Sequence, residues 1–125
     1  MRRLLLSCLI FSAAIFPSCS PQNDTAAPAV SRQTVYVRAG DFAPGQLEAH
    51  YAKHGCQFGS ITQEQYLQQA RELLDAPAGK DVLEKIRDDG DILHYRPSTG
   101  EFAIMTGRGR IRTYFKADYR YWMRQ

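Results

Sequence analysis

The feature that most constrains the fold is a series of short segments in the last third of the chain, in which apolar and polar side chains alternate. The segments cover residues 91–96, 101–106 and 110–116. Two short runs containing Pro or Gly, residues 97–100 and 107–109, separate them. Alternation with period two is typical of β-strands, and turns this short join strands that run antiparallel. The pattern therefore predicts an antiparallel β-meander.

The segments that precede the meander predict helices. Residues 46–54 form the first helix. Residues 62–74 form the clearest one, because Thr62 is a good N-cap, Gln65 completes a capping box, and apolar residues recur at helical spacing. We expect a shorter third helix over residues 80–87.

Together these elements predict an α+β domain, with two to three N-terminal helices packed on a small antiparallel β-meander. Residues 34–38 are rich in β-branched and aromatic side chains and predict a short strand ahead of the helices. We expect the helices to cover one apolar face of the meander. That face consists of Leu93, Tyr95, Phe102, Ile104, Ile111 and Phe115. The single domain is expected to span residues 34–125.

Residues 1–18 have the features of an export signal. A basic start is followed by a mostly apolar run that ends near Phe16 and is too short to cross a bilayer as a helix. The sequence Ser18-Cys19-Ser20 resembles the end of a bacterial lipoprotein signal. This resemblance implies lipidation of Cys19 and an outer-membrane lipoprotein on the periplasmic or cell-surface face. The alternative is ordinary signal-peptidase release, with Cys19 as a plain cysteine.

A polar tether is expected between this signal and the domain. Residues 19–33 consist mainly of Ser, Pro, Gln, Asn, Asp, Thr and Ala, and Val30 is the single large aliphatic residue among them. Such a segment cannot bury enough apolar surface to fold. We therefore expect a flexible linker that holds the domain close to the membrane through the lipid on Cys19.

Positive charge is concentrated at the C-terminal end of the chain. Residues 96–125 carry seven Lys and Arg against two Asp and Glu, whereas residues 20–95 carry seven against eleven. A basic region on an otherwise acidic chain attracts anions such as RNA, an anionic membrane or an acidic protein. Alternation places a basic set on one face of the last strand: Arg110, Arg112, Tyr114 and Lys116. That face suits phosphates and nucleobases, although a solvated strand face has the same pattern.

The end of the chain, residues 119–124, is both aromatic and cationic. The interpretation that we favour is that Trp122 packs onto the core. The alternative is that these rings stack on nucleobases beside phosphate contacts.

His50 and His54 lie four residues apart and thus on one face of the first predicted helix. Two histidines without a third ligand, and outside an HExxH motif, are weak grounds for a metal site. They are either ordinary surface histidines or acid–base groups, because imidazole titrates near neutral pH. We expect no metal ion and no cofactor. Cys56 is expected to be a small buried apolar residue, since a nucleophilic role would need an activating base.

A series of short motifs runs through residues 46–117. They are His50-Tyr51-Ala52-Lys53-His54-Gly55, Phe58-Gly59, residues 62–70, Gly90-Asp91-Ile92 with Tyr95, Gly100-Glu101-Phe102 and Gly109-Arg110-Ile111-Arg112-Thr113-Tyr114-Phe115. In this order they resemble the C-terminal ribonuclease domains of contact-dependent inhibition toxins, within the barnase–EndoU–colicin–RelE-like group.

This resemblance implies metal-independent cleavage of RNA, with tRNA as the specific candidate, and a cognate immunity protein as a further partner. By position, His50 or His54 would be the base or the acid, Arg112 would hold the phosphate, and Thr113 would orient it. The substrate-binding set would be Lys53, His94, Arg110 and Tyr114.

One geometric condition follows from the pleat. Strict alternation separates Arg112 from Thr113, which falls on the face of Ile111 and Phe115, so both act together only if the strand bulges or the site lies at its end. His94 shares a face with Arg112 by the same alternation and is the substitute for the helix histidines.

The alternative function is a non-catalytic surface lipoprotein that binds an anionic partner through its basic C-terminal third.

Overall fold

The computed structural model describes residues 36–125. The elements along the chain are α1 (Gln46–His54), the 3-10 helix η1 (Gly55–Phe58), α2 (Gln63–Asp75), β1 (Leu83–Ile86), β2 (Ile92–Arg96), β3 (Glu101–Met105), β4 (Ile111–Lys116) and α3 (Tyr119–Met123). The expected signal, the lipidated cysteine and the tether, residues 1–33, lie outside the described residues. Within the described part, no helix has both the length and the apolar character that crossing a membrane requires.

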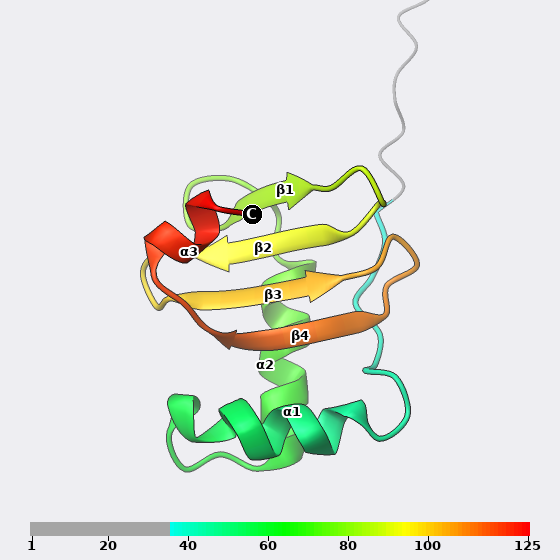
Figure 1. Cartoon of the computed structure of the whole chain (residues 1–125), viewed down its shortest axis with the longest axis vertical. Helices are drawn as coiled ribbons and strands as arrows, with labels where there is room; N and C mark the ends of the chain where they lie inside the picture. Colours follow the sequence, from blue (N-terminus) through cyan, green and yellow to red (C-terminus); the bar gives the residue numbers. More distant parts are fainter. Residues whose placement is uncertain (1–35) are drawn as a thin grey trace, which may run out of the picture. The chain divides into compact units, whose positions relative to one another are not determined.

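The strands form one antiparallel sheet in the order β1-β2-β3-β4, which confirms the predicted meander and the α+β class (Figure 1). Helix α2 crosses behind the sheet, and α1 lies along the β4 edge (Figure 1). The two helices and the four-stranded sheet thus make a two-layer domain.

The predicted third helix over residues 80–87 is wrong. Leu83–Ile86 instead form the edge strand β1, in which Leu83 pairs with Tyr95 and Ile86 with Ile92. The segment is too short for its apolar spacing to distinguish a helix from a strand, and pairing with β2 satisfies its backbone.

The predicted strand over residues 34–38 is also wrong where the structure describes it, from Tyr36 onward. This stretch binds the end of α2 instead of a neighbouring strand. The Ala39 N–H donates to Oδ1 of Asp75 at 2.8 Å, and Nε of Arg71 donates to the Gly40 carbonyl at 2.9 Å. A single bridge, between Phe42 and Ile111, then joins the segment to β4.

Helix α2 begins with the predicted capping box. The Gln65 side chain accepts from the Thr62 N–H at 2.8 Å, and the Thr62 hydroxyl accepts from the Gln65 N–H at 3.2 Å. The buried residues of the helix form one stripe against the sheet: Tyr66, Ala70, Leu73 and Leu74. The cap and the stripe explain why this helix was the clearest in the sequence.

The sheet has an apolar cluster on each face. The cluster facing α2 includes Ala103, Met105, Ile111 and Tyr114. The cluster on the other side, the α3 face, consists of Leu93, Tyr95, Phe102, Ile104 and Trp122, with Phe115 packed against it. The expectation that the helices cover the face of Leu93, Tyr95, Phe102, Ile104, Ile111 and Phe115 is therefore wrong. Helix α2 covers the opposite face, and of these six residues only Ile111 faces it. The expected packing of Trp122 onto the core is confirmed, because the residue is 4% exposed.

Candidate functional site

Strand β4 contains a bulge at Arg112. Ile104 pairs with Thr113, but its neighbour Met105 pairs with Ile111, so Arg112 is an extra residue without a partner on β3. A bulge reverses the alternation of side chains on one side of the extra residue. Ile111 therefore joins the α2 cluster with Met105, and Thr113 lies opposite Ile104 on the α3 face.

The bulge also brings Arg112 to the α3 face. Its Nε donates to the carboxylate of Asp91, at 2.7 Å from Oδ2 and 2.9 Å from Oδ1. Asp91 directly precedes β2 and comes two residues before Leu93, a member of the α3-face cluster, so continuing the alternation of β2 by one residue puts Asp91 on that face. Strict alternation would put Arg112 and Thr113 on opposite faces of the sheet. The bulge puts both on the α3 face, which is the condition under which the two residues can act together. The expected basic face of Arg110, Arg112, Tyr114 and Lys116 is wrong as a continuous face.

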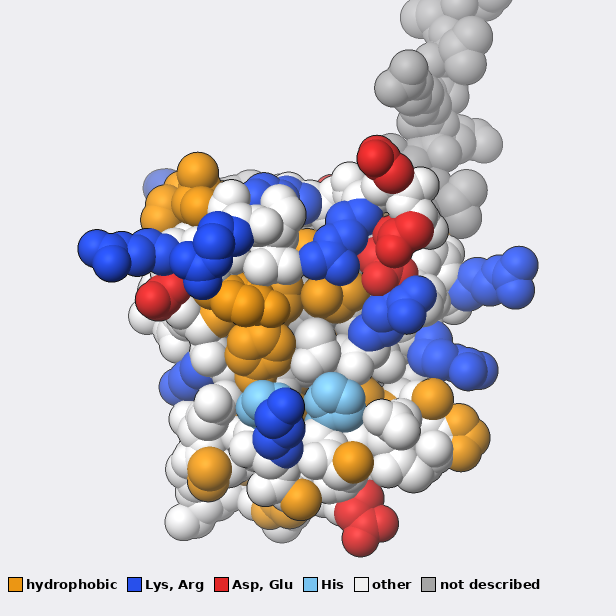
Figure 2. Space-filling view, viewed as in Figure 1, with side chains coloured by type: hydrophobic (Ala, Val, Ile, Leu, Met, Phe, Trp, Pro, Cys, Tyr) orange, Lys and Arg blue, Asp and Glu red, His pale blue; other side chains and the backbone are white. Residues whose placement is uncertain are grey.

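The two histidines of α1 lie together at the border with β4. The rings of His50 and His54 stack with centroids 6.1 Å apart, and His54 also stacks on Phe115 of β4 at 5.2 Å. On its other side, His50 contacts Phe42 at 5.2 Å. Figure 2 shows imidazole side chains in pale blue on this surface, below the apolar and basic groups of the sheet. Helix α1 thus presents both imidazoles beside the α3 face.

Both imidazoles have a lowered pKa, which favours their neutral form. Partial burial, and then the positive charge of Lys53, lower the pKa of His50 below 6.5. The pKa of His54 is lowered by burial, Lys53 and His50, in that order. Nδ1 of His50 is buried and has no hydrogen-bond partner among residues 36–125. A neutral imidazole can accept a proton at neutral pH.

Lys53 and Arg110, two of the expected substrate-binding residues, are exposed. Lys53 lies between the two histidines in sequence and acts on the pKa of both. Arg110 precedes β4, and its backbone N–H donates to the Thr106 hydroxyl at 3.1 Å. The Arg110 side chain therefore extends from the β3–β4 turn.

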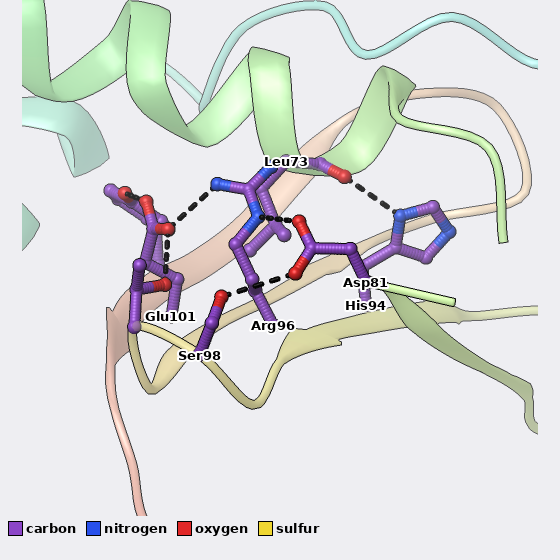
Figure 3. A network of polar contacts seen from close by, with 8 residues as sticks. Leu73, Asp81, His94, Arg96, Ser98 and Glu101 are labelled. Carbon is purple, nitrogen blue, oxygen red and sulfur yellow. Dashed lines mark hydrogen bonds and ion pairs between the residues drawn. The ribbon is translucent and has the colours of Figure 1, made fainter. Parts of the chain in front are cut away.

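His94 and Tyr114, the other two, lie in the layer between the sheet and α2. Nδ1 of His94 is 2.8 Å from the Leu73 carbonyl (Figure 3), and Nε2 is 2.9 Å from Oε2 of Glu84. The Tyr114 side chain is fully buried and donates its hydroxyl hydrogen bond to Glu101. The expectation that His94 shares a face with Arg112 is wrong, because the bulge separates them. Neither side chain joins the histidine pair.

A polar network under α2 surrounds Glu101. Nη1 of Arg96 donates to Oε2 of Glu101 at 2.7 Å, and its Nε lies 3.4 Å from Oδ2 of Asp81 (Figure 3). Burial alone would raise the pKa of Glu101. Hydrogen bonds from Thr99, Tyr114 and Arg96 outweigh burial, so this pKa lies below its usual value. The network connects β2, β3 and β4 rather than forming part of the histidine site.

Sequence reasoning did not include three residues that shape this site: Phe42, Asp91 and Phe115. Phe115 was expected in the apolar core, which gave no sign that its ring also supports His54. Asp91 was seen as part of a motif, but its contact with Arg112 depends on the position of the bulge. Within residues 36–125, no group of three or more His, Cys, Asp and Glu is arranged to hold a metal ion. The expected burial of Cys56 is wrong, because this free cysteine is exposed.

No protein-family model matches this chain, and no curated protein matches it.

Proposed function

We propose that the domain cleaves RNA without a metal ion. The observation that carries this proposal is the bulge at Arg112, which puts Arg112 and Thr113 on the α3 face, beside the border where His50 and His54 lie. Two acid–base groups, a guanidinium and a hydroxyl are the groups that this chemistry uses.

The reaction begins with removal of the proton from a ribose 2′-hydroxyl by one neutral imidazole. The 2′-oxygen then forms a bond to the adjacent phosphorus, and the bond from phosphorus to the 5′-oxygen of the next nucleotide breaks. An acid gives a proton to that 5′-oxygen, so the products are a 2′,3′-cyclic phosphate and a 5′-hydroxyl. His50 and His54 divide the roles of base and acid: the base is neutral, and the acid is an imidazolium that gives up its proton to the 5′-oxygen. The Lys53 ammonium adds positive charge nearby.

Arg112 binds the phosphate undergoing attack, and the Thr113 hydroxyl orients it. A guanidinium stabilises the extra negative charge of the transition state, which is spread over the equatorial phosphate oxygens. Arg110, exposed at the β3–β4 turn, contacts a neighbouring phosphate. In this proposal residues 1–33 export and anchor the domain as an outer-membrane lipoprotein, tRNA is the specific substrate, and an immunity protein is its inhibitor.

The test is RNA cleavage by a chain of residues 20–125 in the presence of EDTA. Wild type is expected to cut RNA and leave 2′,3′-cyclic phosphate ends. His54→Ala and His50→Ala are expected to lose cleavage while their circular dichroism spectra stay unchanged. A wild-type protein that leaves tRNA, ribosomal RNA and single-stranded RNA intact would overturn the proposal.

A second candidate is non-catalytic binding of an anionic partner. Exposed arginines at the β3–β4 turn, Arg108 and Arg110, favour it. It predicts binding that weakens with salt and falls when both arginines are changed to Gln, with no cleavage at any RNA. Binding that persists in high salt would contradict it.

A further inference from the structure

We propose that Asp91 is a positioning residue that sets the orientation of the Arg112 guanidinium before RNA binds. This inference rests on the proposed function, because it assigns Arg112 a phosphate to hold. It adds a residue on a different element, since Asp91 precedes β2 while Arg112 lies on β4.

Asp91 is held rigidly at the turn between β1 and β2. Its carbonyl accepts from the Arg87 N–H at 2.9 Å, and its own N–H donates to Oδ1 of Asp89 at 3.0 Å. The preceding Gly90 has a φ of 84°, a left-handed conformation that favours glycine in this tight turn. The Asp91 side chain is 5% exposed. Its carboxylate is therefore a fixed acceptor at the edge of the α3 face.

The Asp91 carboxylate engages Arg112 through one nitrogen only. Nε of Arg112 contacts both carboxylate oxygens, at 2.7 and 2.9 Å. Among residues 36–125, no hydrogen bond engages the terminal nitrogens, Nη1 and Nη2, and the side chain is 55% exposed. A guanidinium has five N–H donors, of which four belong to the terminal nitrogens. Those donors remain available for a phosphate.

Holding Nε by a buried carboxylate fixes the plane of the guanidinium. A preoriented donor pair spends no free energy on reorganisation when charge develops on the phosphate. The bulge is what permits this arrangement, because without it Arg112 would turn toward α2 and away from Asp91. We therefore expect Asp91 to act on the rate of cleavage through Arg112, without touching RNA itself.

The experiment compares Asp91→Asn with Asp88→Asn, a control that makes the same charge change at an exposed position in the same turn. Asp91→Asn is expected to lower kcat for RNA cleavage by up to about 100-fold while KM changes little. In NMR spectra of the RNA-free protein, the Arg112 Nε–H is expected to exchange slowly with water in wild type and fast in Asp91→Asn. Asp88→Asn is expected to match wild type in both measurements.

A second variant, Arg112→Lys, keeps a cation beside the buried Asp91 and so tests the same idea if Asp91→Asn does not fold. An ammonium cannot bind Asp91 and present a fixed pair of further donors, so this variant is expected to lose kcat to a similar extent. The double variant, Asp91→Asn with Arg112→Lys, is expected to cleave no more slowly than Arg112→Lys alone, because the two changes remove the same interaction. The proposal would be overturned if Arg112→Lys kept the kcat of wild type. It would also be overturned if the loss of kcat in the double variant were the product of the two single-variant losses.

Binding of a short single-stranded RNA with 2′-O-methyl riboses separates this inference from the proposed function. That RNA cannot be cleaved, because it has no free 2′-hydroxyl. If wild type binds it but cleaves no unmodified RNA, the proposed function fails. The orientation of Arg112 by Asp91 is then still supported if the Arg112 Nε–H exchanges slowly in wild type and in Asp88→Asn but fast in Asp91→Asn, and overturned if the exchange rate is the same in all three.

Discussion

The imidazole of His54 stacks on the ring of Phe115, with centroids 5.2 Å apart and planes at 26°. This contact joins the last residue of α1 to β4, two residues beyond Thr113. Phe115 in turn contacts the rings of Phe102 and Tyr121, at 5.2 and 5.4 Å. The position of a candidate acid–base group is thus supported by the aromatic cluster of the α3 face.

Phe115→Leu tests this support. The change keeps apolar bulk but removes the flat ring, so the free energy of unfolding is expected to fall by about 0.5–1.5 kcal/mol, the range for lost aromatic pairing. Cleavage of RNA is expected to fall as well, because His54 loses the surface that fixes its plane. Urea unfolding and initial cleavage rates measure the two effects.

Phe58→Leu is the matched control for Phe115→Leu. Phe58 stacks on Tyr114 at 4.5 Å, on the α2 side of the sheet, and its other ring contact is with Tyr66 rather than with His54. The Phe58→Leu variant is expected to lose about as much free energy of unfolding as Phe115→Leu does, while it keeps the cleavage rate of wild type. Equal activity losses in the two variants would show that cleavage follows stability alone.

The pH dependence of the site follows from the two histidines. Because burial and then the charge of Lys53 lower the pKa of both imidazoles, the acidic limb of the cleavage profile is expected below pH 6.5. Lys53→Met removes one of these causes, so the pKa of both imidazoles and the acidic limb are expected to move to higher pH. NMR titration of the imidazole C–H resonances measures this directly. Lys80→Met, an exposed lysine beyond α2, is expected to leave both titrations unchanged.

Stability depends on the same groups with a definite sign. A histidine whose pKa is lower in the folded state binds a proton more readily in the unfolded state. The contribution of His50 and His54 to the free energy of unfolding is therefore fully present above pH 6.5, and is lost as pH falls from 6.5 through their folded pKa values. Thermal unfolding of wild type and of His50→Asn, measured across this range, should show a weaker pH dependence in the variant.

Glu101→Gln addresses the buried network of Arg96, Thr99 and Tyr114. It removes the charge that Arg96 pairs with, and is expected to destabilise the fold by about 1–3 kcal/mol. Since the pKa of Glu101 is lowered in the folded state, its contribution is present above the unfolded value of 4.5 and is lost as pH falls below it. Urea unfolding at neutral and acidic pH should show a variant penalty that shrinks in acid. A penalty independent of pH would contradict this account, and Asp88→Asn is the exposed control.

The parts of the fold that were predicted from sequence depend on local signals. The capping box of Thr62 and Gln65 and the apolar stripe of α2 are each contained within thirteen residues, and the turns between β2, β3 and β4 carry their own Pro and Gly. The strand β1 has no such signal. It has four residues, and only its pairing with β2 makes it a strand.

The candidate site was predicted only where the signal lies within one helix, and not where it depends on how the strands pair. Helical spacing put His50 and His54 on one face, and the structure has them stacked together. One bulge overturned the face assignments on β4, because a single extra residue changes the parity of every side chain beyond it. No local pattern marks Arg112 as the extra residue, so the contact with Asp91 could not be read from the sequence. The burial of Tyr114 has a different cause, because α2 covers the face of the sheet that the sequence left to solvent.

Trp122 provides a test that separates packing from base stacking. Its ring is buried against Tyr95 at 5.7 Å, and Nζ of Lys85 lies 4.6 Å from the centroid of the indole and donates to the Trp122 carbonyl at 2.9 Å. A ring enclosed in this way has no open face for a nucleobase, so Trp122→Ala is expected to act on stability, by about 3–5 kcal/mol. Met123→Ala, an exposed change on the same helix, is expected to stay within about 0.5 kcal/mol of wild type. At a temperature where both variants are folded, the affinity for 2′-O-methyl RNA should equal that of wild type. A loss of RNA affinity in folded Trp122→Ala would instead assign this ring to the binding surface.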